Sequence, residues 1–287
     1  MSKIIFFDVD GTLVNFSCKM PESTRTALEL LHKNGHKLVV STGRSKSEVY
    51  PWLLSMDWDG LICGAGAYVE WNKKEIYAKY MSDRMVEIIV EYIESRGGTY
   101  ILEGSSAIWE RDILVDKNRA LIEEWIKASN GNGIDAPIPK ARLFSQLSEV
   151  SHIHKLNFHG MDMDAAVMEN ELNRLLRGEG LGNVKAIRFN NGNVFVTSGE
   201  ITIEGIHKSF GIDMLLKESG FDTCDSVAFG DSLNDYEMIK NSGTGIAMGN
   251  ACDALKEAAD MVTSNIDEDG IYNAVKRLGL IKNDNII

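Results

Sequence analysis

Near its N-terminus the chain alternates short, fully apolar segments with amphipathic ones. Residues 3–8, 36–41 and 61–63 have the β-rich composition of buried strands, and residues 21–35 and 45–55 between them have the apolar spacing of helices. Strands that are apolar on both faces are typical of a parallel sheet whose crossover helices cover both of its faces. We therefore predict an α/β fold with a Rossmann-like parallel sheet in this part of the chain.

The same alternation returns toward the C-terminus, where we expect helices at 208–219, 235–241, 251–259 and 269–278 and strands at 226–229 and 245–248. The middle of the chain differs, with helices expected at 85–95, 113–128 and 164–177 and strands at 99–102, 153–159, 184–189 and 193–197. The strand at 153–159 alternates as a half-exposed strand does, and the last two strands resemble a hairpin around Asn190-Asn191-Gly192. The predicted organisation is a core domain, residues 1–81 and 199–287, interrupted by an α+β cap, residues 82–198.

The composition excludes several classes of partner. The chain has 287 residues, a formal net charge of −12 and no run of Lys and Arg that would form a basic stripe, so nucleic acid is a poor partner. Its apolar stretches are far shorter than the about 20 residues of a membrane span, and no signal peptide precedes the acidic residue at position 8. We therefore expect a soluble cytoplasmic protein that does not bind membranes. No pattern indicates an oligomeric state.

Two groups of potential ligands carry weak signals. The four cysteines are far apart in sequence and contain no C-x-x-C pair, which favours buried free thiols over a zinc or redox site. His152 and His154 would share one face of their strand, a placement compatible with a metal or substrate contact. One strand pattern by itself favours a structural role for both histidines.

Polar residues follow three of the predicted core strands. Asp8 and Asp10 follow the first strand, Ser41-Thr42-Gly43 the second, and Gly230-Asp231-Ser232-Leu233-Asn234-Asp235 a third. The carboxyl ends of parallel strands lie at one edge of an open sheet, where α/β proteins bind ligands. Each motif alone could be a capping turn, but together they gather oxygen ligands without Cys or His. That set suits Mg²⁺, and clustered carboxylates would repel one another without a cation.

These segments resemble the motifs of the haloacid dehalogenase-like superfamily of phosphatases and phosphotransferases. Asp8-Val9-Asp10-Gly11-Thr12 is similar to its first motif, Ser41-Thr42-Gly43 to the second, Lys208 to the third, and the segment from Gly230 to Asp235 to the fourth. The insert between the second and third motifs resembles the large α/β cap of the Cof-type sugar phosphatases. The similarity spans essentially the whole chain, and the cap is its least specific part.

The resemblance implies a role for each of these residues. Asp8 would be the nucleophile that forms an aspartyl phosphate, and Asp10 the general acid and base. Mg²⁺ would be held by Asp8, the backbone carbonyl of Asp10 and Asp231, while Asp235 would orient these ligands. The phosphoryl group would be held by Ser41, Thr42, Gly43, Lys208 and Asn234. Arg44 would either contact the rest of the substrate or pair with a surface acid.

The chain is thus expected to be a Mg²⁺-dependent phosphatase of small phosphorylated metabolites, with sugar phosphates as the expected class. Two alternatives stay open at this point. A phosphomutase on the same scaffold would return the phosphoryl group to a sugar, and a non-catalytic sensor would only bind phosphosugars. The presence of both Asp8 and Asp10 favours catalysis, because binding alone needs no acid/base pair.

Overall fold

The computed structural model describes residues 2–128, 140–188 and 198–281. The chain divides into two compact units, of which the first comprises Met1–Gly43, Tyr50–Ala78 and His207–Ile287, and the second Arg44–Val49 and Lys79–Ile206. Within the described part of the chain, no helix combines the length and the apolar character needed to cross a membrane.

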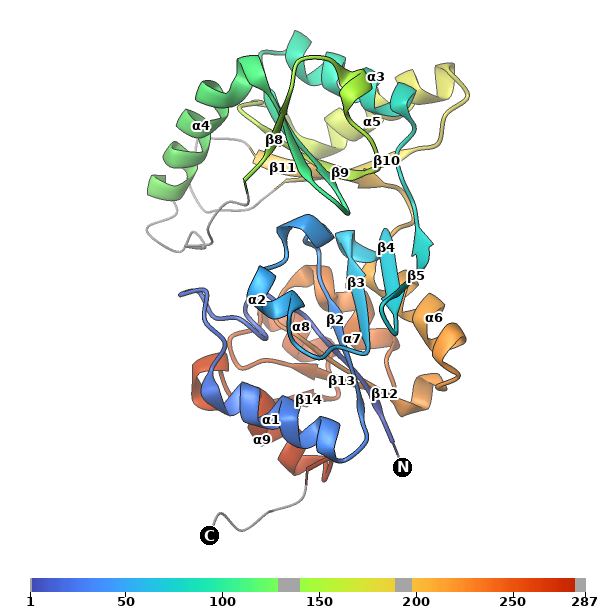
Figure 1. The fold of residues 1–287 in the computed structure, drawn as a ribbon. Coiled ribbons are helices and arrows are strands. Elements are labelled where there is room, and N and C mark those ends of the chain that lie inside the picture. Colours follow the sequence, from blue (N-terminus) through green and yellow to red (C-terminus); the bar gives the residue numbers. More distant parts are fainter. Residues whose placement is uncertain (1, 129–139, 189–197, 282–287) are drawn as a thin grey trace. The chain divides into compact units, whose positions relative to one another are not determined.

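The first unit is built on an eight-stranded sheet (Figure 1) with the strand order β14-β13-β12-β1-β2-β3-β4-β5. Its strands are β1 (Ile4–Phe7), β2 (Lys37–Ser41), β3 (Gly60–Cys63), β4 (Tyr68–Trp71), β5 (Lys74–Ala78), β12 (Ser226–Gly230), β13 (Thr244–Ala247) and β14 (Met261–Val262). The strands from β14 to β3 are parallel, and β4 and β5 add an antiparallel hairpin at one edge. The α/β fold class predicted from the sequence is confirmed.

Helices flank this sheet: α1 (Glu22–Lys33), α2 (Pro51–Leu54), α6 (Lys208–Ser219), α7 (Tyr236–Asn241), α8 (Asp253–Ala258) and α9 (Gly270–Arg277). The buried residues of α6, α7 and α8 pack in one cluster with Ile4, Phe6 and Val39 from the central strands, and α1 packs against α9. The α6 helix ends at Gly220, whose φ of +76° is the left-handed conformation that favours glycine.

The central strand, β1, fixes where the polar motifs lie. All of its residues are buried, and it pairs in parallel with β12 on one side and β2 on the other. Phe7 lies opposite Phe229 of β12 and Val40 of β2, so the three strands end at the same edge of the sheet. The residues that follow them are thereby brought together, as the parallel-strand argument requires.

The second unit is built on a six-stranded sheet with the order β10-β11-β9-β6-β7-β8, antiparallel except for the pair β7 and β8. The strands are β6 (Thr99–Gly104), β7 (Ile108–Arg111), β8 (Arg142–Phe144), β9 (Ile153–His159), β10 (Val184–Arg188) and β11 (Ser198–Ile203), and the helices α3 (Asp83–Ser95), α4 (Val115–Ala128) and α5 (Ala165–Gly178). Residues of α3 and α5 form one apolar core with the sheet. Ser82 caps α3 and Asp164 caps α5 by accepting backbone N–H groups of the first turn.

Of the predicted hairpin, the structure describes the first strand, which corresponds to β10. β10 pairs with β11 at Ser198–Ile203, while the expected strand at 193–197 lies outside the described residues. The predicted domain boundary between residues 198 and 199 therefore falls inside β11, and the second unit runs on to Ile206.

Two local predictions are wrong. The continuous helix expected at 45–55 is interrupted, because Val49 and Tyr50 are extended. The helical region is disfavoured for Tyr50, which directly precedes Pro51. The four cysteines are free, but only Cys63 is fully buried, and Cys224 and Cys252 are exposed.

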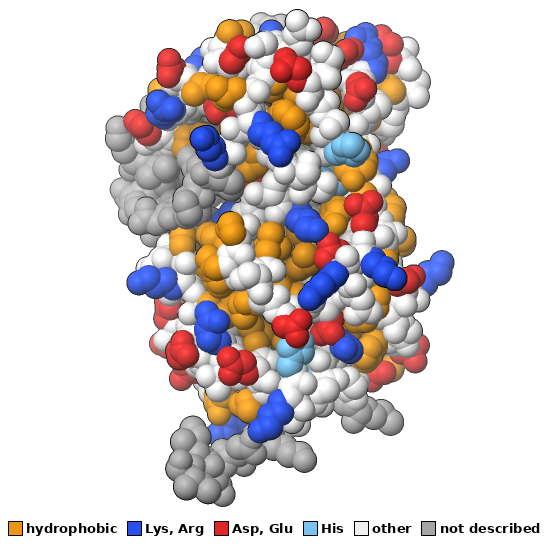
Figure 2. Space-filling view, in the orientation of Figure 1, with side chains coloured by type: hydrophobic (Ala, Val, Ile, Leu, Met, Phe, Trp, Pro, Cys, Tyr) orange, Lys and Arg blue, Asp and Glu red, His pale blue; other side chains and the backbone are white. Residues whose placement is uncertain are grey.

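On the face shown in Figure 2, acidic and basic side chains of the described residues are interspersed, and no continuous basic stripe is visible there.

Candidate active site

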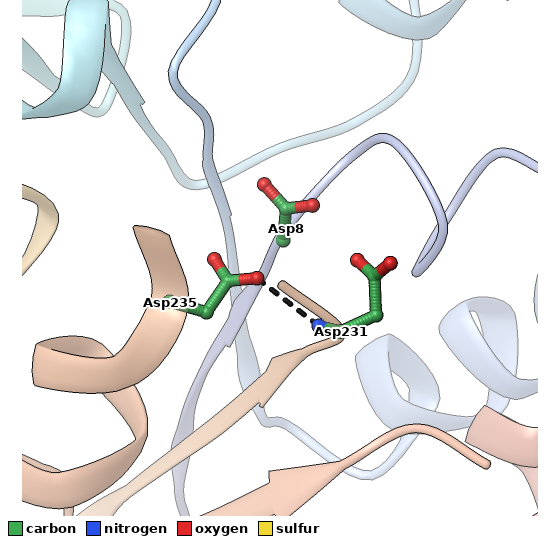
Figure 3. Close-up of side chains that lie close together, drawn as sticks. All are labelled: Asp8, Asp231 and Asp235. Carbon is green, nitrogen blue, oxygen red and sulfur yellow. Dashed lines mark hydrogen bonds between the residues drawn. The ribbon is translucent and has the colours of Figure 1, made fainter. Parts of the chain in front are cut away.

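Three carboxylates meet at the carboxyl edge of the first sheet. Asp8 directly follows β1, Asp231 follows β12, and Asp235 ends a short 3₁₀ helix, Leu233–Asp235. One oxygen atom from each lies within 4.8 Å of the others, and Figure 3 shows the three side chains around a common space. Asp8 and Asp235 are buried, with 5% and 0% of their surface exposed. Three of the acids that follow the predicted core strands thus lie close together, and Asp10 is not a member of this group of three.

The cation among them is Lys208, the first residue of α6. Only 1% of its surface is exposed, and its Nζ lies 2.6 Å from Oδ1 of Asp8 and 2.5 Å from Oδ1 of Asp235. A third contact of 3.3 Å reaches Oδ1 of Asn234. Lysine is almost never fully buried unless it is paired, so these contacts explain how Lys208 is accommodated.

Asp235 uses both of its carboxylate oxygens within the protein. Oδ1 accepts from Lys208, while Oδ2 accepts the backbone N–H groups of Asp231 at 3.0 Å (dashed in Figure 3) and of Ser232 at 3.1 Å. A Cβ atom on Gly230 would lie 2.5 Å from the Cβ of Asp235, so a side chain at position 230 would displace this carboxylate. These bonds suit a residue that orients the loop better than one that ligates a metal.

The electrostatics of the cluster show a shortage of positive charge. Burial, and then the charge of Asp235, raise the pKa of Asp8 well above its usual range despite the opposing effect of Lys208. Burial and Asp235 likewise raise the pKa of Asp231 to about 7. Burial alone would lower the pKa of Lys208, but the carboxylates of Asp235 and Asp8 outweigh it and raise that pKa. Carboxylate oxygens with excess negative charge and no soft ligand fit a hard divalent cation.

The second motif lies beside Asn234. Ser41 ends β2 with its hydroxyl fully buried and, among the described residues, without a hydrogen-bond partner. Thr42 is also buried, and its backbone N–H donates to the carbonyl of Ile62. A Cβ atom on Gly43 would lie 3.7 Å from Nδ2 of Asn234. Since Asn234 also contacts Lys208, the structure brings the second, third and fourth motifs together.

Asp10 and Arg44 have different surroundings. Asp10 is half-buried, and its Oδ1 accepts from the hydroxyl of Tyr50 at 3.4 Å. Arg44 belongs to the second unit, where its guanidinium donates to the backbone carbonyl of Glu48 at 3.3 Å. Arg44 is thus not among the residues that the first unit gathers around Asp8.

Two contacts of the first motif were missed at the sequence level. The hydroxyl of Thr12 donates to Oδ1 of Asp231 at 3.3 Å, and the side-chain amide of Asn250 donates to the carbonyl of Gly11 at 2.8 Å. Oδ1 of Asn250 accepts the N–H of Ile266, so this one side chain connects three loops. The signal for it was present, because Asn250 stands just after an apolar strand at the same sheet edge.

His152 and His154 contact an aromatic side chain of the second unit. The rings of His152 and His154 both lie against Tyr80, with centroids 4.8 and 4.6 Å from its ring. Among the described residues, Asp8, Asp231 and Asp235 are the only group of three or more His, Cys, Asp or Glu side chains close enough to share a metal ion.

The first unit thus has an α/β core that is interrupted by an inserted unit, with a buried Lys208 paired to Asp8 and Asp235 at its carboxyl edge. Residues 5–275 match the family described as haloacid dehalogenase-like hydrolase, and the chain belongs to it. It is an enzyme, a phosphatase, and the resemblance drawn from its motifs is confirmed.

Similar proteins support this class over the full length of the chain. YkrA of Bacillus subtilis (strain 168) is 30% identical over 281 residues, which cover 98% of this chain and 99% of YkrA. YcsE of the same organism, a 5-amino-6-(5-phospho-D-ribitylamino)uracil phosphatase, is 24% identical, covering 96% of this chain and 94% of YcsE. The structure of BT4131, described as a HAD subclass IIB sugar phosphatase, superimposes with a TM-score of 0.73 at 28% identity, covering 98% of this chain and 100% of BT4131.

Proposed function

We propose that this phosphatase hydrolyses phosphomonoesters of small metabolites, sugar phosphates above all, through an aspartyl phosphate on Asp8. The observation that carries the proposal is the buried Asp8 carboxylate, held by Lys208 at 2.6 Å and adjoined by Asp231. A buried nucleophile beside a fixed cation is suited to attack on an anionic phosphoryl group.

The reaction would proceed in two displacements. A carboxylate oxygen of Asp8 attacks phosphorus, the bond from phosphorus to the ester oxygen breaks, and Asp10 gives its proton to that leaving oxygen. Asp10, now ionised, takes a proton from a water molecule that attacks the phosphorus of the aspartyl phosphate. The bond to Asp8 breaks, phosphate leaves, and both aspartates regain their starting states.

The other residues would hold the phosphoryl group and the charge. Lys208 stabilises its oxygens and the acyl phosphate, while Ser41, Thr42, Gly43 and Asn234 surround it with hydrogen-bond donors. Mg²⁺ would be held by the carboxylates of Asp8 and Asp231 and the backbone carbonyl of Asp10, with Asp235 orienting them. When bound, the ion supplies positive charge that lets an anionic nucleophile approach an anionic phosphate.

The substrate class rests on the relatives. BT4131 is described as a sugar phosphatase, and the name of YcsE gives a phosphoribitylamino compound as its substrate. Both descriptions join a phosphate ester to a polyhydroxylated carbon chain. We extend that chemistry to this chain, together with the cytoplasmic location and the absence of nucleic-acid partners that its sequence predicts.

A phosphate-release assay tests the proposal. The purified protein is incubated with p-nitrophenyl phosphate, glycerol phosphate, hexose 6-phosphates and pentose 5-phosphates, each with Mg²⁺ and with excess chelator. We expect Mg²⁺-dependent release, fastest from sugar phosphates. Isomerisation of a sugar phosphate with little free phosphate would indicate a phosphomutase, and binding without turnover would indicate a sensor. Either result would overturn the proposed hydrolysis.

A further inference from the structure

The hydroxyl group of Tyr50 lies near the carboxyl group of Asp10, the proposed general acid and base. Tyr50 is only 4% exposed, and its hydroxyl oxygen is 3.4 Å from Oδ1 of Asp10 and 3.6 Å from Sγ of Cys18. A phenol has a single proton to donate, and a carboxyl oxygen is a far better acceptor than a thiol sulfur. We therefore assign the proton of the Tyr50 hydroxyl to Asp10.

The backbone conformation at Tyr50 differs from that of a helix. Tyr50 has φ −51° and ψ 127°, an extended conformation that interrupts the helical spacing of residues 45–55 and precedes Pro51. Its ring stacks on Trp52 with centroids 5.7 Å apart, which fixes the plane of the phenol. The helix break therefore lies at the residue whose hydroxyl contacts Asp10.

We propose that Tyr50 is a positioning residue that orients the carboxyl group of Asp10 for proton transfer to the leaving oxygen. This inference rests on the proposed function, in which Asp10 is the general acid and base. With the phenol donating to Oδ1, the proton that reaches the leaving group is the one carried on Oδ2. Oδ1 accepts from Tyr50 both before and after that transfer, so the contact need not break during the reaction.

The length of the contact is consistent with this role. A separation of 3.4 Å is long for an O–H···O hydrogen bond, and catalytic hydrogen bonds often tighten only when substrate is bound. A purely structural tyrosine would affect all substrates alike. A residue that acts through a general acid should matter most when the leaving oxygen is strongly basic, because such a group must be protonated as it departs.

The test compares leaving groups in Tyr50→Phe, which keeps the ring and removes only the hydroxyl. For the best alkyl phosphate of the panel, we expect kcat to fall about tenfold, the size of one hydrogen bond's net contribution, with little change in KM. For p-nitrophenyl phosphate, whose leaving group needs little protonation, we expect a change below about twofold. Tyr68→Phe is the matched control, because that hydroxyl donates to Glu70 on the edge hairpin.

A double-mutant cycle provides a second test of whether Tyr50 acts through Asp10. If Tyr50 acts through Asp10, adding Tyr50→Phe to Asp10→Asn should slow the alkyl phosphate no further. Equal losses for both leaving groups, no loss for either, or additive losses in the cycle would each overturn the role of Tyr50 while leaving the phosphatase assignment intact. Failure of the wild type to release phosphate from any substrate would instead overturn the proposed function, and this inference with it.

Discussion

Nζ of Lys208 lies 2.6 Å from Oδ1 of Asp8, although 200 positions separate the two residues along the chain. Both segments of the second unit, Arg44–Val49 and Lys79–Ile206, lie between these two residues in the sequence. Asp8 follows β1 at the carboxyl edge of the parallel sheet, and Lys208 reaches it from the first position of α6. This ion pair therefore forms only when the separate segments of the discontinuous first unit pack together.

Replacing Lys208 by Ala should leave the carboxylates of Asp8 and Asp235 without their buried cation. We expect phosphate release to fall by about 10²–10³-fold, as when one preorganised electrostatic contact to a transition state is removed. Lys217→Ala on the exposed face of the same helix is the control and should keep wild-type turnover. Comparable rates for the two variants in a phosphate-release assay would remove Lys208 from the mechanism.

Gly11→Ala should displace Asp231. A Cβ atom at this position would lie 2.2 Å from Oδ2 of Asp231, and the φ of +87° adds backbone strain. Gly35→Ala separates the two effects, because Gly35 has a similar φ of +80° but no atom within 4 Å of such a Cβ. We expect Gly11→Ala alone to raise the Mg²⁺ concentration needed for half-maximal activity. The same Mg²⁺ dependence in both variants would contradict a role for Asp231 at the metal.

The stability of the metal-free protein should depend on pH through Asp231. Its pKa rises from 3.8 to about 7 on folding, so the folded protein retains a proton that the unfolded chain releases between these values. Stability without metal is therefore present at low pH and falls as pH rises from about 4 to about 7. Mg²⁺ would bind the ionised carboxylates, so the increase in Tm on adding Mg²⁺ should be larger at about pH 7.5 than at about pH 5. An increase independent of pH in thermal unfolding would contradict this charge balance.

In the second unit, removal of the buried cation of Lys155 should lower stability substantially. Its Nζ lies 3.1 Å from Glu200 and 3.2 Å from Glu103, and its side chain is 7% exposed. Lys155→Met leaves these carboxylates uncompensated, which typically costs about 3–5 kcal/mol of unfolding free energy. The control is Lys185→Met, whose pair with Glu169 is exposed and should cost at most about 1 kcal/mol. Denaturant unfolding measures both, and equal costs would contradict the burial argument.

The sequence was sufficient for the core and its motifs because their signals are local. An apolar run that ends in Asp8 specifies a buried strand followed by a carboxylate. In a parallel sheet the carboxyl ends of neighbouring strands lie at one edge, so the polar residues after them are brought together. Lys208 was different, since a lysine at a helix start is usually exposed, and only the family resemblance singled it out. Its burial depends on pairing with Asp8 and Asp235. Asp8 is remote from Lys208 in the sequence, and nothing in the sequence around Asp235 indicates that it pairs with a lysine.

Features that depend on burial or on backbone exceptions were not predictable. The strand at 153–159 alternates in sequence as a half-exposed strand does, yet almost all of it is buried, because carboxylates on neighbouring strands pair with Lys155. The hairpin of β4 and β5 turns at Asn72 and Lys73, both with positive φ and without a glycine to mark the turn. Tyr50 was overlooked because apolar spacing outweighed the effect of the proline after it.

The central claim is that Asp8 is the nucleophile, and turnover by Asp8→Asn tests it most directly. Asn removes the attacking carboxylate but keeps the side-chain shape, and it relieves charge repulsion in the buried cluster, so the variant should stay folded with an unchanged or higher Tm in the absence of Mg²⁺. We predict that its Mg²⁺-dependent phosphate release falls by at least about 10³-fold. A folded Asp8→Asn enzyme with turnover close to the wild type would contradict the account.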